Sequence, residues 1–540
     1  MLHNKWILSL LYLFTFSIGI FLVGIDLYGF LDASYHYCGD LWDTRFNNVI
    51  LEHNYRFFLG KEKSYWSAQF FFPAKNTLAG SDTHTATALF YCFFRIIGLD
   101  YFASFNLWLA LLFLLNFISI IFVCNKLNVN IIPTLVGSYL FTFSIPVLDQ
   151  VHHVQSLYKF PIPLIFYFTY QFLMYYNPRY LYGALFSFII LIYSSLYNIV
   201  FLIIPFLIFI FLIISFNLKK SYSLKENLTS LINKLFTKNK WHFIISIVIL
   251  LIAYLPIHIY YGNHHCWDKN FLLNTISNWK VIFITHYNSI LYGDIVSCLD
   301  NSIQPTAWEH HYNFGYISFF MFLLLLLYSI LKKDFNSLIW IIPGIIFYVI
   351  YTKINDFTLF EYLAGIKGFC NAKGTWRFYL ITLSTISIFY SIALDKFSKT
   401  INLKILSILF LIILITENSL KKNTLKYTDL NYARNKHLPL LNIIQKNRKS
   451  NHKAFVVLPD STFQQEAIDL VSTMVAYQFS NLPTINGYTT YSPDGYCLDW
   501  SKPQKEQVYR WLKYNNWSDN DIENNVLYIY CSNDSTYYVK

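Results

Sequence analysis

Long uncharged apolar runs alternate with short polar segments along most of the chain. A helix needs about 17–25 such residues to cross roughly 30 Å of hydrocarbon. The runs that reach this length are 6–25, 104–123, 131–148, 160–176, 241–260, 313–331, 335–352, 376–394 and 401–416. A further stretch, between Arg179 and Lys219, has no charged residue and is too long for one helix. We expect two helices there, hinged near 194–198, so the pattern predicts an α-helical polytopic membrane protein with about eleven transmembrane helices.

The charges between these runs predict the orientation of the chain. Segment 219–240 has six lysines against one glutamate. The short loops on the same side of the membrane have Lys126, Arg179, Lys332, Lys333, Lys396 and Lys399. Because loops rich in lysine and arginine stay in the cytoplasm, we expect an inner (plasma) membrane protein with a cytoplasmic N-terminus and an extracytoplasmic C-terminus. The regions expected on the outer side are 26–103, 261–312, 353–375 and 417–540.

The alternation also predicts the domain organisation. We expect a transmembrane domain over 1–416, with 26–103 and 261–312 as its first and second outer loops. A small extracytoplasmic α/β domain is expected over 417–540. Its predicted strands are 454–458 and 526–530, and its predicted helices are 466–477 and 504–514.

Composition strengthens the membrane interpretation. The chain is 55% hydrophobic and 13% charged, whereas a soluble domain usually has about 25% charged residues. The net charge of +11 indicates topology control and contact with anionic membrane lipid, and not nucleic-acid binding, because no basic soluble domain is visible. The eight cysteines are irregularly spaced and form no disulfide framework. A bridge between Cys266 and Cys298, which share an outer loop, is the pairing that we consider.

The first outer loop, 26–103, is dense in polar and aromatic residues. A plain connector between two helices needs only a few residues, so a loop of this length is expected to have a function. The apolar residues of 47–58 indicate a helix lying in the membrane interface. The candidate site residues of this loop are Asp40, Asp43, Lys75, Asp82 and His84.

This loop resembles the first long outer loop of glycosyltransferases of the GT-C superfamily. These polytopic enzymes use sugars linked to polyprenyl phosphate. The likeness rests on an acidic residue soon after the first span, the segment Phe72–Asn76, the pair Ser81–Asp82 and the entry to the second span at 94–108. It implies a GT-C-like fold and an inverting glycosyltransferase with a polyprenyl-phosphate-linked sugar donor. The acceptor would be a glycan, a lipid or a protein at the outer face of the membrane.

The chemistry of such a reaction asks for one base. A phosphate leaving group, with a second pKa near 6, needs no proton from an acid, so a single carboxylate suffices to activate the acceptor. We expect Asp40 to be this base, with Asp43 as the second candidate. The alternative is that one of them caps a helix beginning near Thr44. Asp82, His84 and Lys75 are expected to bind substrate, with helix capping as the alternative for Asp82.

A basic, glycine-containing segment precedes the run 376–394. Lys367, Lys373 and Arg377 lie in it. Glycines let the backbone approach an anion, and the start of the following helix favours negative charge. We expect Arg377 and Lys373 to bind the lipid phosphate, and the alternative is that they extend toward lipid headgroups.

Three histidine doublets, His152-His153, His264-His265 and His310-His311, are expected on the outer side. Neighbouring residues of a helix do not face the same way, so each doublet offers at most one metal ligand. No spacing such as HExxH is present. We therefore expect no cofactor and expect these histidines to hydrogen-bond to sugar hydroxyls or lipid headgroups, with a bound divalent metal as the alternative.

Other classes of protein remain alternatives. A transporter or lipid flippase usually has ionisable groups within its spans, whereas the polar residues here gather in the outer loops. An outer-leaflet polysaccharide polymerase or ligase is a related enzymatic alternative.

The predicted topology can be tested with reporter fusions. Fusions after Lys225 and after Lys540 should report opposite compartments, because lysines concentrate in 219–240 and not in the outer loops. Alkaline phosphatase and green fluorescent protein, each fused at both positions, give complementary signals. The same compartment at both positions would show that the number of spans between them is wrong by one.

Overall fold

The computed structural model describes residues 2–24, 36–219, 239–297, 310–400, 404–421, 427–533 and 536–539. The chain divides into two compact units. We call the first, 1–25, 109–259 and 263–425, the helical unit, and the second, 26–108, 260–262 and 426–540, the loop–tail unit. Most of the lysine-rich segment 219–240 lies outside the described residues, as does Cys298.

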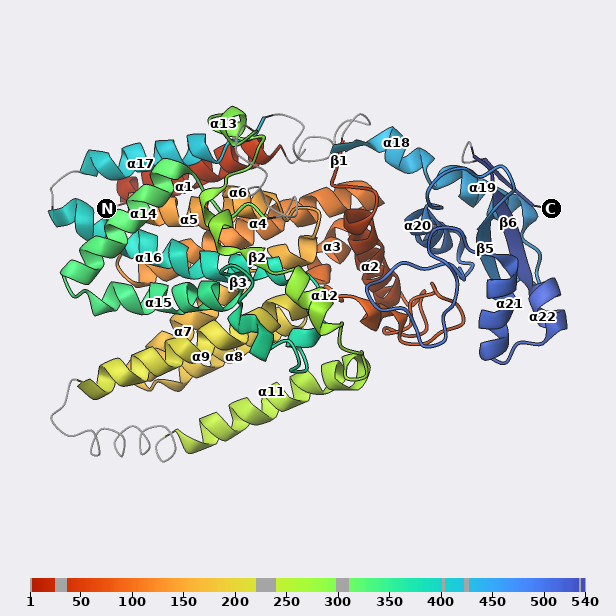
Figure 1. Ribbon diagram of the computed structural model, residues 1–540, viewed down its shortest axis with the longest axis horizontal. Helices are drawn as coiled ribbons and strands as arrows, with labels where there is room; N and C mark the ends of the chain where they lie inside the picture. Colours follow the sequence, from red (N-terminus) through yellow and green to blue (C-terminus); the bar gives the residue numbers. More distant parts are fainter. Residues whose placement is uncertain are drawn as a thin grey trace. The chain divides into compact units, whose positions relative to one another are not determined.

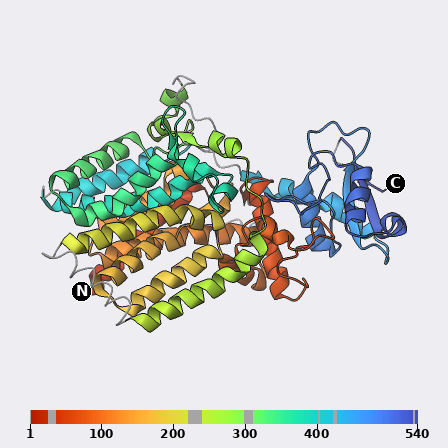
Figure 2. The ribbon, with the colours of Figure 1, turned by 60° about the horizontal axis from the view of Figure 1, so that its bottom comes forward.

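Each predicted apolar run forms a helix. The long helices are α1 (Leu2–Val23), α4 (Tyr101–Lys126), α5 (Ile131–Phe143), α7 (Pro161–Tyr175), α8 (Pro178–Ile192), α9 (Leu196–Lys219), α11 (Lys240–Tyr261), α14 (Tyr316–Leu331), α15 (Phe335–Ile350), α16 (Tyr379–Thr400) and α17 (Lys404–Glu417). The gap between α8 and α9, at 193–195, confirms the hinge predicted from the long uncharged stretch. In the helical unit, α16 packs against α5 and α15, and α7 packs against α8 (Figures 1 and 2).

The helices have the properties of an integral membrane protein. Five stretches among the described residues are long and apolar enough to cross a membrane: Tyr101–Lys126, Ile131–Leu148, Leu196–Phe216, Lys240–Tyr261 and Thr375–Thr400. Along α11 only Ser246 and Ile257 are buried, and large apolar side chains such as Leu251 and Ile252 are exposed. Such a surface suits lipid contact. The predicted total of about eleven spans stays a prediction.

Short elements of the helical unit bring separate loops together. They are α6 (Ile145–Leu148), η2 (Val154–Leu157), α12 (Lys269–Asn274), β2 (Ser277–Asn278), η4 (Trp279–Phe283), α13 (Gly293–Ser297), β3 (Thr352–Lys353), η5 (Leu359–Tyr362), η6 (Phe369–Asn371) and η7 (Thr375–Phe378). Strands β2 and β3 pair in parallel. Cys266 is bonded to Cys370, so the pairing with Cys298 considered from the sequence is wrong. The true partner lies in another outer loop, which proximity along the chain does not reveal.

A buried carboxylate fixes the start of α14. Glu417, the last residue of α17, accepts hydrogen bonds from the N–H of Ile317 at 2.7 Å and from the N–H and hydroxyl of Ser318 at 2.9 and 2.6 Å. The Tyr292 hydroxyl donates to it at 2.6 Å. Unpaired N–H groups and the helix dipole both favour negative charge at this position. Gly315, with φ of +109°, leaves room for the carboxylate, because a Cβ there would lie 2.4 Å from Glu417 Oε2.

The loop–tail unit joins the first outer loop to the C-terminal region. Its elements are β1 (His36–Cys38), α2 (Asp43–Phe58), η1 (Thr77–Gly80), α3 (Thr85–Ile96), β4 (Tyr427–Asp429), α18 (Leu430–Asn435), α19 (Leu438–Asn447), β5 (Ala454–Pro459), α20 (Leu470–Ser480), α21 (Lys505–Tyr514), α22 (Asp519–Asn525), β6 (Val526–Cys531) and β7 (Tyr537–Tyr538). β1 pairs antiparallel with β4. β5 and β6 are parallel, and β7 is antiparallel to β6. The strands and helices predicted for the tail therefore form, but the compact unit also contains 26–108 and does not begin at 417.

Helix α2 is largely buried within the loop–tail unit, so most of the apolar residues on which the interfacial prediction for 47–58 rests face the protein, and the interfacial position stays a prediction. Residues 44–54 and Arg56 are all buried. Fully buried Arg45 donates to Ser472 Oγ at 2.9 Å, and Arg56 donates to Asn481 Oδ1 at 2.8 Å. Most apolar residues of α2 are therefore buried within the unit, whereas Phe58 at its C-terminal end is exposed. Helix α3 also has exposed apolar side chains, including Phe93.

Because Glu417 lies so close to Gly315, we predict that any side chain at position 315 destabilises the protein. Gly315→Ala should destabilise the helical unit by about 1–3 kcal/mol, because a left-handed alanine is strained, and the clash with Glu417 adds to this cost. Gly365→Ala is the matched control, since a Cβ there meets nothing within 4 Å. Thermal unfolding of both purified variants in detergent measures the difference. Equal melting temperatures for the two variants would refute this account of α14.

Candidate functional site

Asp40 lies three residues before α2, two before its N-cap residue Trp42, and bonds to the first turn of the helix. Its Oδ1 accepts hydrogen bonds from the N–H groups of Trp42 at 2.9 Å and Thr44 at 3.1 Å. In return, the Asp40 N–H donates to the Thr44 hydroxyl oxygen at 3.3 Å. The capping alternative is thus found at Asp40. The side chain is still half-exposed, so it is not sealed from an acceptor.

Asp43, one turn further, faces a tyrosine of the tail. The Tyr488 hydroxyl donates to Asp43 Oδ1 at 2.7 Å. Burial and the negative charge of Asp43 raise the pKa of Tyr488, so this phenol keeps its proton and remains a donor. The Tyr488 ring meets that of Phe46 edge to face, with centroids 5.5 Å apart. Asp43 is therefore held by a specific aromatic partner.

Asn47 connects this end of α2 to the segment before α3. Its amide donates to the Asp43 carbonyl at 2.6 Å, and its Oδ1 lies 2.6 Å from Nε2 of the fully buried His84. His84 has φ of +56°, a conformation that a non-glycine residue adopts only where its surroundings hold it. Asp40, Asp43 and His84 thus belong to one polar cluster around the first turns of α2.

The other predicted residues of the first loop have different surroundings. Asp82 is 5% exposed, and the neighbouring Ser81 carbonyl accepts from the Tyr261 hydroxyl at 2.6 Å. Helix α3 has His84 at its N-cap and no capping bond from a side chain there, so the predicted capping by Asp82 is not seen at this position. Lys75 is exposed.

Arg377 is a buried cation of the helical unit. Its guanidinium carbon lies 5.3 Å from the Tyr197 ring centroid and 5.8 Å from that of Trp376. A Cβ at Gly374 would lie 3.0 Å from the guanidinium, so the glycine makes room for it. Arg377 is on η7, immediately before α16. A cation that lies near two aromatic rings and beside a helix start has the elements of an anion site.

Lys373 and Lys367 lie on the surface of the same segment. The Lys373 ammonium lies 5.0 Å from the Trp267 ring centroid, and Lys367 donates to the His264 carbonyl at 2.7 Å. Both side chains are exposed. The disulfide between Cys266 and Cys370 fixes this basic segment to the loop after α11.

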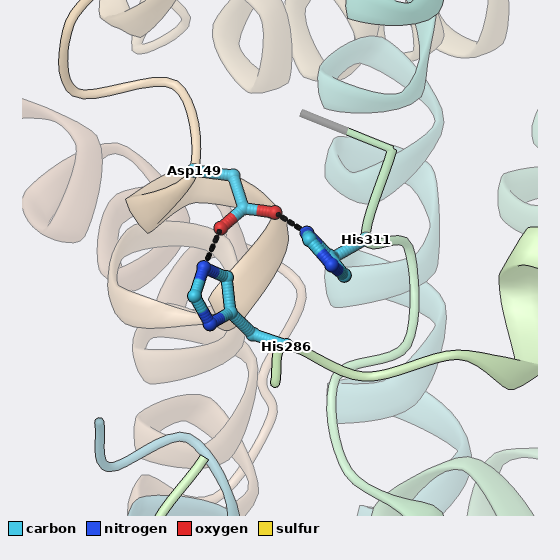
Figure 3. A group of neighbouring side chains, drawn as sticks. All are labelled: Asp149, His286 and His311. Carbon is cyan, nitrogen blue, oxygen red and sulfur yellow. Dashed lines mark hydrogen bonds and ion pairs between the residues drawn. The ribbon is translucent and has the colours of Figure 1, made fainter. Parts of the chain in front are cut away.

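A second cluster in the helical unit consists of Asp149, His286 and His311 (Figure 3). Asp149 Oδ2 lies 2.7 Å from His311 Nδ1, and its Oδ1 lies 3.4 Å from His286 Nε2. Burial lowers the pKa of His286 to about 4. Only His311 comes from a doublet singled out in the sequence. Asp149 and His286 were missed because their segments are distant along the chain and show no ligand spacing.

The predicted site residues are thus divided between the units. Asp40, Asp43, Asp82, His84 and Lys75 belong to the loop–tail unit, and Arg377 and Lys373 belong to the helical unit. Sequence reasoning missed Asn47 and the specific role of Tyr488. The only sequence signal for Tyr488 is its place in a turn-rich aromatic stretch of the tail.

These features define a helical integral membrane protein with a polar, aromatic cluster in its loop–tail unit. No family model matches the sequence, and no curated protein matches it. Among solved structures, the chain is similar to the Archaeoglobus fulgidus oligosaccharyltransferase in its apo form, with a TM-score of 0.49 and 11% identity over 90% of this chain and 65% of that one. The chain therefore spans about two thirds of that neighbour's length, 65%.

A second similar structure is the archaeal oligosaccharyltransferase AglB from Archaeoglobus fulgidus in complex with an inhibitory peptide and a dolichol-phosphate. The TM-score is 0.47 and the identity 9%, over 98% of this chain and 69% of that chain. Both neighbours are oligosaccharyltransferases. Since the two TM-scores lie below 0.5, we argue the function from the chain's own residues.

Proposed function

We propose that this protein is an inverting glycosyltransferase of the GT-C type. It moves a sugar from a polyprenyl-phosphate donor to a glycan, lipid or protein acceptor at the outer face of the membrane. The observation that carries the proposal is the polar cluster at the start of α2, where Asp40 and Asp43 lie among hydrogen-bonding and aromatic side chains of the tail. Carboxylates beside aromatic rings suit a site that binds sugar and activates a hydroxyl or amine.

The proposed reaction needs only one proton transfer at the acceptor. Asp40 takes the proton as the acceptor oxygen or nitrogen bonds to the anomeric carbon. The bond from that carbon to the phosphate oxygen breaks on the opposite face, and its electron pair leaves with the polyprenyl phosphate. The configuration at the anomeric carbon is therefore inverted. Asp43, hydrogen-bonded to Tyr488 at 2.7 Å, would orient the acceptor or replace Asp40 as the base.

The donor phosphate would bind at Arg377. A guanidinium offers paired donors that match a phosphate, and Gly374 leaves the backbone open around it. Lys373, exposed beside Trp267, would add positive charge at the same segment. The neighbour bound to a peptide and a dolichol-phosphate suggests including a dolichol-type donor and a peptide acceptor among the assay substrates.

Asp40→Asn should lower the transfer rate by about 10²–10⁴-fold, the usual cost of losing a general base. The variant should fold normally, because asparagine caps helices about as well as aspartate does. Asp43→Asn is the matched control: it retains an acceptor for the Tyr488 hydroxyl and should cost less activity. Transfer from a radiolabelled polyprenyl-phosphate sugar measures both, at equal yields of purified protein.

The outcome of this pair assigns the base. An active Asp40→Asn beside an inactive Asp43→Asn would move the role to Asp43. Full activity in both variants would remove this cluster from the chemistry and refute the proposed mechanism.

Arg377→Ala should weaken binding of the donor, because a hydrogen bond to a charged group contributes about 1.5–3 kcal/mol. Arg377→Lys should restore only part of the affinity, because lysine lacks the paired donors of a guanidinium. Lys367→Ala is the control, since this exposed lysine donates to a carbonyl of the chain. Equilibrium binding of a polyprenyl phosphate to protein in detergent gives the comparison. Unchanged affinity in Arg377→Ala would exclude Arg377 as the phosphate ligand.

A further inference from the structure

Three buried side chains from three separate segments converge in the helical unit. Asp149 follows α6, His286 lies between η4 and α13, and His311 precedes α14. Their exposed fractions are 6%, 7% and 2%. Figure 3 shows both imidazoles pointing at the one carboxylate. One potential ligand atom from each of the three residues lies within 4.8 Å of the other two.

The charge of this cluster is not balanced by a basic side chain. Among the described residues, the ion pairs of Asp149 are with His286 and His311 alone, and neither lysine nor arginine contacts it. Asp149 also lies just after the end of α6, where it lacks the helix N-terminal N–H groups that Glu417 uses. An ionised carboxylate is expensive to bury without a positive partner, and here that partner is either a protonated imidazole or a bound cation. A bound cation would balance Asp149 while both imidazoles stay neutral.

We infer that Asp149, His286 and His311 form a binding site for a divalent transition-metal ion, with Zn²⁺ as the best match. Two imidazoles and a carboxylate are a ligand set that zinc accepts, with the remaining position left to water. Zinc lies about 2.0–2.2 Å from such nitrogen and oxygen ligands, so the three ligand atoms, which lie within 4.8 Å of one another, have to rearrange around the ion. Hard cations such as Mg²⁺ and Ca²⁺ prefer oxygen ligands, which favours a softer metal here.

Binding would change the hydrogen bonds of both rings. His311 Nδ1 now lies at hydrogen-bond distance from Asp149, and His286 Nδ1 accepts from the Asn288 N–H at 2.9 Å. An ion bonded to His286 Nε2 places that ring's proton on Nδ1, where it meets the Asn288 N–H. The turn at Asn288 therefore has to move when the metal binds. The alternative to a metal site is a cluster in which His286 and His311 share protons with Asp149 through hydrogen bonds.

The metal would have a structural effect. It would tie the end of α6 to the segments before α13 and before α14. The sequence-based expectation weighed only the three histidine doublets as sources of ligands, one from each, whereas two of the three residues here, Asp149 and His286, lie outside every doublet. The inference is independent of the proposed glycosyl transfer, because it concerns binding and stability and not activity.

The test uses the full chain, purified in detergent and stripped with a chelator. Zn²⁺ added alone should bind with one ion per chain by titration calorimetry. At about 100 times its dissociation constant it should raise the melting temperature by several degrees, because it binds only the folded state. X-ray absorption of the zinc-loaded wild-type protein should show two imidazole ligands. Absence of an imidazole shell, or no binding at millimolar Zn²⁺, would overturn the inference without touching the proposed function.

Variants locate the ion. Asp149→Asn and His311→Gln should each weaken Zn²⁺ binding at least about tenfold, while His265→Gln, an exposed histidine of the same outer loop, should leave the affinity unchanged. Unchanged Zn²⁺ affinity in Asp149→Asn would place the ion elsewhere and refute the site. If either cluster variant fails to fold, the absorption spectrum of the wild-type protein still decides.

Discussion

Charged side chains in both units are held by hydrogen bonds to polar groups of the chain, and this constraint sets where several helices begin. Asp40 and Glu417 accept backbone N–H bonds at the starts of α2 and α14. Arg45 and Arg56 hold α2 against the tail through side-chain and carbonyl oxygens. In a medium of low dielectric constant, leaving one of these groups without its partner would destabilise the fold by more than the intact hydrogen bond stabilises it. The elements that carry these residues are therefore fixed by polar contacts as much as by apolar packing.

The helices follow from the sequence because their cause is local. An uncharged run must be long enough to cross the hydrocarbon, and that length can be counted. The break at 193–195 is predictable for the same reason, since the stretch from Arg179 to Lys219 exceeds one span. Strands β5 and β6 also follow from short apolar runs between turn-rich segments.

What the sequence does not predict depends on contacts between distant residues. Helix α2 has the pattern of an interfacial helix, but most of it is buried within its unit, and Gln478 bonds to Val49 across 429 positions. Likewise, Cys266 finds Cys370 across 104 positions. The same limit applies to the candidate sites. Composition and position mark Asp40 as a candidate base, but only the fold shows that it also caps a helix.

The proposed transfer and the proposed metal make separate demands on the molecule. A departing phosphate is negatively charged and needs a cation such as Arg377. The single proton transfer to Asp40 requires no Lewis acid. The Asp149 cluster and the base also belong to different compact units. A metal at Asp149 would therefore hold together the loops that it joins. It would give the buried carboxylate a positive partner, just as the N–H groups at the start of α14 give Glu417 hydrogen-bond donors.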